Sequence, residues 1–209
     1  AGPSSVAGMS THNLINLLRP KSIALIGASD QPGHMGAVTW RNLTTSGFKG
    51  RLYAVNPNHE ALGGIACYPT VAALPEAPDL AVIVTPAKTL PGLTAELTAK
   101  GAKSAVVITA GFAGAEGGTL KQRMLDNARQ SGLRILGPNC LGLIIPPLGV
   151  NAAFAHLMPQ PGSIAFVSQS GAILTSVIDW AQPRGLGFSH LVSMGELGDV
   201  DFGDILDYL

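Results

Sequence analysis

The feature that most constrains the fold is an apolar strand that runs directly into a glycine-rich turn near the N-terminus. Residues 22–26 read Ser-Ile-Ala-Leu-Ile, glycines follow at Gly27, Gly33 and Gly36, and a helix-like segment, Ala37–Thr45, comes next. A strand, a glycine loop and a helix in this order present backbone N–H groups to a phosphorylated ligand. The spacing differs from the dinucleotide pattern G-x-G-x-x-G. The loop therefore predicts a nucleotide diphosphate ligand, but NAD is not the obvious choice.

Apolar runs alternate with helical stretches along the first two thirds of the chain. The expected strands are Ser22–Ile26, Leu52–Val55, Leu80–Val84, Ser104–Thr109 and Arg134–Leu136. The expected helices are Ala37–Thr45, Leu90–Lys100 and Leu120–Ser131. Most of these strands are continuous apolar runs, which is typical of strands covered by helices on both faces. The pattern predicts an α/β fold with a Rossmann-like, doubly wound parallel sheet.

A second unit begins after this sheet. Leu143–Gln160 contains three prolines and is expected to be an irregular connector. The strand–helix alternation then restarts with expected elements at Ser163–Val167, Ile173–Ala181, Phe188–Val192 and Phe202–Leu209. A βαβα unit alone buries too little surface to close a core, so we expect it to be the start of a larger domain.

These patterns divide the chain into four expected segments. Residues 1–10 resemble a remnant of a cloning vector and lack the charged and apolar regions of a signal peptide. Residues 11–142 would form the first domain, 143–162 a linker, and 163–209 the truncated start of the second domain.

Composition narrows the class of protein. Of the 209 residues, 46% are hydrophobic and 12% charged, and 13 basic residues balance 13 acidic ones. A net charge of zero argues against a nucleic-acid or anionic-membrane partner. No apolar run is long enough to span a membrane. Two cysteines are too few for a disulfide framework and favour small buried side chains in a reducing, cytoplasmic setting. The five histidines lack the spacing of a metal site, so no metal is expected.

The end of the second strand argues against NAD. The chain reads Val55-Asn56-Pro57-Asn58-His59 at this point. Dinucleotide-binding domains place an acidic residue here to hold the ribose hydroxyls, whereas Asn56 is neutral. An ordinary turn built on Asn56 and Pro57 is the alternative interpretation.

Two more strand ends carry small or hydroxyl-bearing residues. Val84-Thr85-Pro86 and Thr109-Ala110-Gly111 follow expected strands, and the carboxyl ends of parallel strands line a ligand crevice. These residues suit a flat purine ring and a pantetheine arm. Ordinary strand-to-helix turns are the alternative, but their repeated placement at strand ends favours a crevice.

Ser168-Gln169-Ser170-Gly171 precedes the first helix of the second unit. Small polar residues at a helix N-terminus can form an anion site, so these four residues are expected to bind a phosphoryl group. The G-x-S-x-G pattern of serine hydrolases is absent. Capping of the helix by Ser168 or Ser170 is the alternative. A later acidic run, Glu196 to Asp207, is expected to serve mainly as helix caps and solvated charge.

Taken in order, these motifs resemble the NDP-forming acyl-CoA synthetases, relatives of the succinyl-CoA synthetase α subunit. The resemblance extends from Leu14 to Leu209. It rests on Arg19–Ser29, Val55–Pro57, Val84–Pro86, Ile108–Phe112, Gly137–Asn139, Ser168–Gly171 and Gly198–Asp204. It implies a CoA-binding Rossmann-like domain followed by the start of a flavodoxin-like domain.

The resemblance also implies a cofactor and site residues. CoA or acetyl-CoA would bind with its diphosphate on the glycine loop and its adenosine across the next strand ends. The implied cofactor-binding residues are Gly27, Ser29, Asp30, Gln31, Gly33, Asn56, Pro57, His59, Val84, Pro86, Thr109, Ala110, Gly111 and Asn139. Many relatives carry a lysine after the second-strand proline, suited to the CoA 3′-phosphate. Asn58 and His59 stand there instead, so His59 is the candidate substitute.

The resemblance leaves the parent protein's chemistry to segments outside this chain. The phosphorylated histidine of the family would lie beyond Leu209. An ATP-grasp domain, with ATP or ADP and Mg²⁺, would also lie elsewhere in the protein. No catalytic residue is therefore expected in this segment, and on its own we expect it to be inactive. Both a monomer and a homo-oligomer are compatible with the sequence.

One branch of the family is most similar at Asn151–Phe154, Asp179–Ala181 and Gly187–His190. This branch is fused to a GNAT domain that acetylates protein lysines. The chain would then be an acyl-CoA-sensing region, and otherwise part of an ADP-forming acid–thiol ligase. An NAD(P)-binding oxidoreductase domain is the alternative from a different class of enzyme.

Overall fold

The computed structural model describes residues 13–209, so the expected cloning remnant at residues 1–10 lies outside the described residues. One sheet has seven strands in the order β3-β4-β2-β1-β5-β6-β7, all parallel to their neighbours except β3. Its strands are β1 Ser22–Ile26, β2 Arg51–Val55, β3 Ala61–Leu62, β4 Ile65–Tyr68, β5 Leu80–Ile83, β6 Ser104–Val107 and β7 Arg134–Leu136. The expected α/β fold with a Rossmann-like sheet is confirmed.

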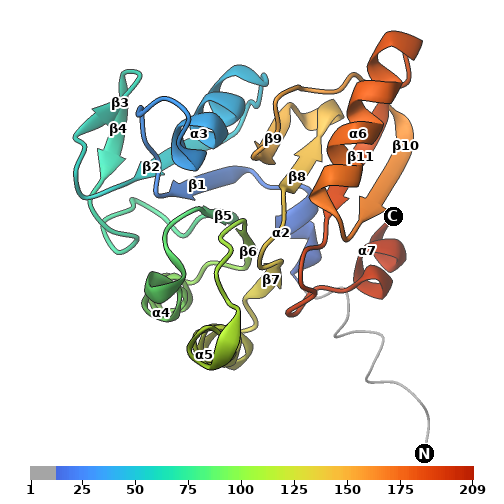
Figure 1. The fold of residues 1–209 in the computed structure, drawn as a ribbon. Helices are drawn as coiled ribbons and strands as arrows, with labels where there is room; N and C mark the ends of the chain where they lie inside the picture. The colour runs from blue at the N-terminus through green and yellow to red at the C-terminus, as the bar shows by residue number, and fades with distance from the viewer. Residues whose placement is uncertain (1–12) are drawn as a thin grey trace, which may run out of the picture.

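Helices cover both faces of this sheet. They are α2 Leu14–Leu18, α3 Met35–Thr45, α4 Leu90–Lys100 and α5 Gly114–Ser131. Figure 1 shows α4 and α5 on one side of the sheet and α3 on the other. Along β1, Ile23 and Leu25 pack with α2 and α3, whereas Ala24 and Ile26 pack with α4 and α5. Burial on both faces explains why the strand reads as one apolar run.

The second sheet has four strands in the order β10-β11-β8-β9. Its elements are β8 Gly142–Ile145, β9 Val150–Ala153, β10 Pro161–Ser168, α6 Gly171–Ala181, β11 Phe188–Ser193 and α7 Phe202–Tyr208. β10 and β11 are parallel and are joined through α6, as the sequence predicts. β8 and β9 pair antiparallel with each other, and β8 pairs antiparallel with β11.

The expectation of an irregular connector at 143–160 is wrong for residues 143–153, whereas residues 154–160 form no helix or strand. The first part of the segment forms the β8–β9 hairpin, and its prolines Pro146 and Pro147 occupy a short 3₁₀ turn between the two strands. Proline is excluded from central ladder positions but fits a turn, so these prolines mark the turn of a hairpin. The hairpin is buried, because β9 packs beside α3. The side chain of Asn42 donates to the carbonyls of Ala153 at 2.9 Å and Ala155 at 2.7 Å.

Helix α5 starts six residues before the expected start at Leu120. The glycines at 114, 117 and 118 lie outside the expected helix but inside the first turns of the observed one. Gly117 allows this, because a Cβ there would collide with the backbone of Phe112. Because residue 117 is a glycine, the helix can pass close to the backbone of Phe112, and it therefore starts directly after the loop that follows β6.

The segment that joins β11 to α7 runs beside the end of β7 and ties the two sheets together. The N–H groups of Glu196, Gly198 and Val200 donate to carbonyls of Pro138, Gly137 and Ile135 at 2.9, 2.9 and 3.0 Å, respectively. The segment thus covers the outer edge of β7, which would otherwise expose unpaired N–H and C=O groups.

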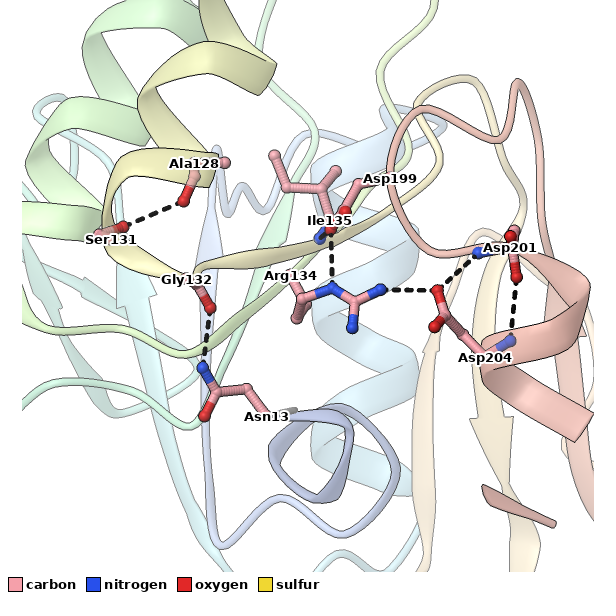
Figure 2. Close-up of polar contacts among 9 residues, drawn as sticks. All are labelled: Asn13, Ala128, Ser131, Gly132, Arg134, Ile135, Asp199, Asp201 and Asp204. Atoms are coloured by element: carbon pink, nitrogen blue, oxygen red, sulfur yellow. Dashed lines mark hydrogen bonds and ion pairs between the residues drawn. The ribbon is translucent and has the colours of Figure 1, made fainter. Parts of the chain in front are cut away.

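An ion-pair cluster reinforces this junction (Figure 2). Arg134, at the start of β7, contacts Asp199 at 3.1 Å and Asp204 at 2.6 Å, and its side chain is only 12% exposed. Asp199 also accepts from the N–H of Ile135 at 2.8 Å. Asp204 and Asp201 form a capping box at the start of α7. The helix-capping role expected for the acidic run is confirmed at Asp201 and Asp204, but Asp199 and Asp204 also pair with Arg134.

Candidate functional site

The carboxyl ends of five parallel strands form one continuous row. Gly27 donates to the carbonyl of Val55 at 2.9 Å, and Asn139 donates to that of Thr109 at 2.9 Å. The end of β5 lies between these two pairs and bonds to β1 and β6. The order is therefore β2, β1, β5, β6, β7, which at ordinary strand spacing spans about 19 Å. Such a row is where open α/β sheets bind ligands.

The first hollow along the row is a cavity of about 320 Å³ at the ends of β1, β2 and β5. Among the residues expected from the sequence, Gly27, Asn56, Pro57 and Pro86 line it. Thr85, which the sequence also placed at a crevice, lines it as well. Further lining residues, which sequence reasoning missed, are Ile26, Val55, Pro69, Thr70, Val71, Thr89, Leu93 and Glu96. The cavity has apolar walls, with hydroxyl groups and one carboxylate at its lining. That composition suits a flat, partly polar ring such as a purine.

Asn56 holds the neighbouring loops in place. Its Nδ2 donates to the carbonyl of Ala28 at 2.8 Å, and its Oδ1 accepts from the N–H of Asn58 at 3.0 Å. The second contact is the Asx turn that the alternative interpretation expected. The first ties the end of β2 to the glycine loop. Both ends of this amide are therefore engaged within the protein at the position where an NAD site would offer a carboxylate to the ribose.

The glycine loop separates the first cavity from a second hollow. Ser29, Asp30 and Gly33 line a groove of about 480 Å³ whose other walls come from α3 and the β3–β4 hairpin. The hydroxyl of Ser29 accepts from the N–H of Gln31 at 3.0 Å. Of the expected loop residues, Gly27 therefore lies at the cavity, Ser29, Asp30 and Gly33 lie at the groove, and Gln31 lines neither hollow.

The start of α3 leaves backbone donors for an anion. Its N-cap residue His34 makes no capping hydrogen bond through its side chain. The first N–H groups of a helix have no intrahelical acceptor, and the helix dipole is positive at this end. Gly36 lies here because a Cβ would collide with the carbonyl oxygen of Gly27. The start of α3 and the end of β1 thus approach each other more closely than any residue other than glycine at position 36 would allow.

Threonine hydroxyls connect the next two strand ends. Thr85 and Thr89 share a hydrogen bond of 2.8 Å between their hydroxyls, and Thr109 donates to the carbonyl of Thr85 at 2.7 Å. Thr109 is buried, so its side chain braces the row, while the exposed backbone of Ala110 and Gly111 forms the surface.

The remaining expected residues of this row lie farther from the cavity. Val84 is half-buried directly before Thr85, and Asn139 is exposed at the end of β7. His59 is half-buried in the turn after β2 and lines neither the cavity nor the groove. The structure therefore does not bring the side chain of His59 into the same hollow as Asn56 and Pro57.

The serine loop stands at the carboxyl end of the second sheet. Ser170 caps α6, with its hydroxyl accepting from the N–H of Ile173 at 3.4 Å. The hydroxyl of Ser168 accepts from the N–H of Ser170 at 3.1 Å. The capping alternative is thus present in the structure, while Gln169 is exposed and the N–H groups of Gly171 and Ala172 lack an intrahelical acceptor.

The serine loop and the strand-end row are neighbours. Met194 donates to the carbonyl of Ser168 at 2.8 Å, and Leu141 donates to the hydroxyl of Ser193 at 2.9 Å. Leu141 follows Asn139 by two residues and would contact a Cβ added at Gly171. The segment after β7 therefore lies between the two expected binding regions.

Two charged residues beside Asn139 were also missed from the sequence. Glu196 accepts from the Asn139 amide at 3.2 Å and from Lys121 of α5 at 2.8 Å. The acidic run had been interpreted as caps and solvated charge. The Lys121–Glu196 pair joins residues 75 positions apart, and no local pattern signals such a contact.

The cysteines are structural. Burial raises the pKa of the Cys140 thiol to about 12 and also raises that of Cys67. A thiol held protonated is a poor nucleophile, which agrees with the expectation of small buried side chains. In the part of the chain from residue 13 onward, no group of three potential ligands could hold a metal ion. No helix in the same part is long and apolar enough to cross a membrane.

Comparison with protein families matches both units. Residues 21–146 match a family described as CoA binding domain, and residues 161–209 match one described as succinyl-CoA ligase like flavodoxin domain.

The relatives that are similar in sequence point to the same family. The chain is 44% identical over 195 residues to acetate–CoA ligase [ADP-forming] I of Archaeoglobus fulgidus, covering 92% of this chain and 28% of the relative. It is 38% identical to the α subunit of the corresponding Pyrococcus furiosus ligase I, covering 92% and 43%.

A solved structure extends the similarity to three dimensions. The dinucleotide-forming acetyl-coenzyme A synthetase 1 of Ca. Korarchaeum cryptofilum, in complex with phosphate and ADP, matches with a TM-score of 0.89 and 37% identity. The match covers 93% of this chain and 42% of that one. The chain thus spans less than half the length of these relatives. An NAD(P)-binding oxidoreductase finds no counterpart among these matches. By domain, sequence and fold, the chain belongs to the family of ADP-forming acetate–CoA ligase α subunits, of which it represents the CoA-binding portion.

Proposed function

We propose that the row of strand ends binds CoA and acyl-CoA, with the nucleotide at the β1–β2–β5 end and the thiol end toward β7. The observation that carries this proposal is the joint placement of a purine-sized cavity and an uncapped helix N-terminus on opposite sides of Gly27. The adenine would occupy the cavity, and the diphosphate would lie on the Gly27–Gly33 loop. Backbone N–H groups and the α3 dipole would hold its charge.

The pantetheine arm would then follow the row past Thr109, Ala110 and Gly111 toward Asn139. The wall of the row at these positions is backbone and small side chains, which suits a narrow, flexible arm. Its far end points toward the serine loop, because the segment after β7 contacts that loop. His59 lines neither hollow. We therefore propose that the loop of His59 rearranges when the 3′-phosphate binds, and that His59 contacts the phosphate in the rearranged loop.

We propose that the serine loop binds inorganic phosphate in the complete protein. There, an oxygen of phosphate would attack the thioester carbonyl, the CoA thiolate would leave, and an acyl phosphate would form. The N–H groups at the start of α6 would orient the phosphate and stabilise its charge. Later transfer to a histidine and to ADP, with Mg²⁺, would need segments of the protein outside these 209 residues.

We further propose that the longer protein belongs to the branch fused to a GNAT lysine acetyltransferase, with this portion sensing acyl-CoA in the cytoplasm. The similarity at Asn151–Phe154, Asp179–Ala181 and Gly187–His190 supports it. The gene sequence downstream of Leu209 tests it. A GNAT domain without the phosphorylated histidine would support the sensing role, whereas that histidine with an ATP-grasp domain would contradict it.

Calorimetric titration of the chain with CoA, acetyl-CoA and NAD tests the binding proposal. We expect CoA and acetyl-CoA to bind more tightly than NAD. The substitution Thr70→Glu, which places a carboxylate on the cavity wall, should weaken CoA binding about tenfold or more. Thr119→Glu makes the same charge change on an exposed turn of α5 and should leave binding unchanged. Tighter binding of NAD than of CoA, or equal effects of the two substitutions, would overturn the proposal.

A further inference from the structure

Asn139 occupies a special position at the end of the strand-end row. Its backbone adopts the left-handed conformation, with φ of 56°, and its N–H donates to the carbonyl of Thr109 at 2.9 Å. Its side chain is exposed and donates through Nδ2 to Oε1 of Glu196 at 3.2 Å. The other carboxylate oxygen of Glu196 accepts from Lys121 at 2.8 Å. Three residues from three separate segments thus meet at this point.

The carboxylate determines which way the Asn139 amide faces. An amide group can be rotated by half a turn at little intrinsic cost, which exchanges its donor and acceptor ends. An ionised carboxylate only accepts hydrogen bonds, so it requires Nδ2 and excludes Oδ1. Lys121 contacts the second carboxylate oxygen at 2.8 Å and so holds the carboxylate of Glu196 in place. Because Nδ2 is the atom that contacts Glu196, the amide oxygen of Asn139 is directed away from it, and within residues 13–209 this oxygen accepts no hydrogen bond from the protein.

We propose that Glu196, held by Lys121, is a positioning residue that presents the Asn139 carbonyl oxygen to an amide N–H of the pantetheine arm. The inference rests on the proposed CoA-binding function and specifies one part of it. The amide oxygen of Asn139 is a hydrogen-bond acceptor, so its partner on the ligand must be a hydrogen-bond donor. The pantetheine arm carries two secondary amides with N–H donors, whereas the ionised diphosphate offers only acceptors.

The position of Asn139 agrees with that chemistry. It lies four strands from Asn56, or about 19 Å along the row at ordinary strand spacing. The nucleotide cavity and the glycine loop lie at the other end of this distance. A ligand that reaches both ends must place its arm, and not its nucleotide, at Asn139.

Two ligands separate this role from a general structural one. CoA carries the pantetheine arm, whereas adenosine 3′,5′-bisphosphate carries the nucleotide end alone. For Glu196→Gln, whose own amide can face Asn139 either way, we expect CoA affinity to fall about threefold to tenfold, the effect of one hydrogen bond. The affinity for adenosine 3′,5′-bisphosphate should stay within about twofold of the original protein. Glu116→Gln, an equal charge change at an exposed position of α5, should alter neither.

A double-mutant cycle tests whether Glu196 acts through Asn139. Asn139→Gly removes the amide and keeps the left-handed backbone accessible. In that background Glu196→Gln should have no further effect on CoA affinity. An unchanged CoA affinity in Glu196→Gln, equal losses for both ligands, or additive losses in the cycle would overturn the inference. Failure of the unsubstituted chain to bind either ligand would instead overturn the proposed function.

Discussion

Two of the loops that lead from a parallel strand into a helix, those after β1 and β10, are built differently. The loop after β1 relies on glycines, because Gly27 has a φ of 94° and Gly36 packs directly on its carbonyl. The loop after β10 relies on serines, whose hydroxyls bond to the backbone of the loop and cap α6. The first loop thus leaves its helix uncapped, whereas the second supplies its own cap.

The difference agrees with the two tasks proposed for these loops. An uncapped helix start next to a purine-sized cavity has backbone donors available for a ligand whose charge is fixed to a large molecule. A self-capped helix is stable without a ligand, so a small, exchangeable anion can come and go there. The comparison predicts that the first loop is intolerant of side chains and the second intolerant of losing hydroxyls.

The largest effect should come from removing the ion-pair cluster of Arg134, Asp199 and Asp204, which links the two sheets. Arg134→Met leaves Asp199 and Asp204 without their cation in a partly buried site, which should cost about 3 kcal/mol of the free energy of unfolding. Urea denaturation would measure this. The exposed pair between Arg129 and Asp126 provides the control, and Arg129→Met should have almost no effect. Equal effects of the two substitutions would show that the cluster contributes no more to the free energy of unfolding than an exposed ion pair does.

The next effect should come from the glycine loop. Gly36→Ala places a Cβ against the carbonyl of Gly27, so the strand and helix must separate. We expect a loss of about 2 kcal/mol in stability together with weaker CoA binding. At Gly118, also inside a helix but with open space around it, Ala should stabilise by about 0.5–1 kcal/mol. A neutral Gly36→Ala variant would show that close approach is dispensable in this loop.

A smaller effect should come from the serine loop. Ser170→Ala removes the cap of α6 and should cost about 1 kcal/mol in thermal or urea unfolding. His34→Ala, at the equivalent position of α3, removes no capping bond and should be close to neutral. If His34→Ala proved as costly as Ser170→Ala, the contrast between the two loops would disappear.

The smallest effect concerns Cys140, between the two loops. Its pKa in the folded chain is raised to about 12 from an ordinary value near 9, so the unfolded chain loses this proton first. Stability from this group is present below pH 9 and declines as the pH rises toward 12. We expect the urea midpoint of Cys140→Ala to fall less over pH 9–11 than that of the unsubstituted chain. An identical pH dependence in both proteins would contradict this.

The first sheet could be predicted closely from the sequence, and the reason is its burial. β1, β7 and α4 have the bounds that the apolar runs suggested. The β3–β4 hairpin was missed although Gly63-Gly64 is a recognised turn signal, because its strands have only two and four residues. The β8–β9 hairpin was missed because its prolines resembled a linker. Short strands carry too few residues for a periodic pattern to emerge.

The candidate site was predictable where it follows strand ends and not where it depends on helices or distant loops. Gly27, Asn56 and Pro86 could be placed because a strand end is visible in the sequence. Glu96 projects from the middle of α4, and Glu196 meets Lys121 across 75 positions. Both contacts depend on how the elements pack. A pattern that extends over a few residues contains no information about such packing.

The segment 196–200 beside β7 has a consequence for folding during synthesis. The first sheet is completed at its outer edge by residues that follow it by about sixty positions. During translation, β7 leaves the ribosome before residues 196–200 are made. Its outer edge therefore stays unpaired until β8 to β11 have also emerged. Contacts between residues so far apart in sequence slow folding, and an unpaired edge is exposed to other chains meanwhile. We expect nascent chains that end near residue 150 to be the most prone to aggregate.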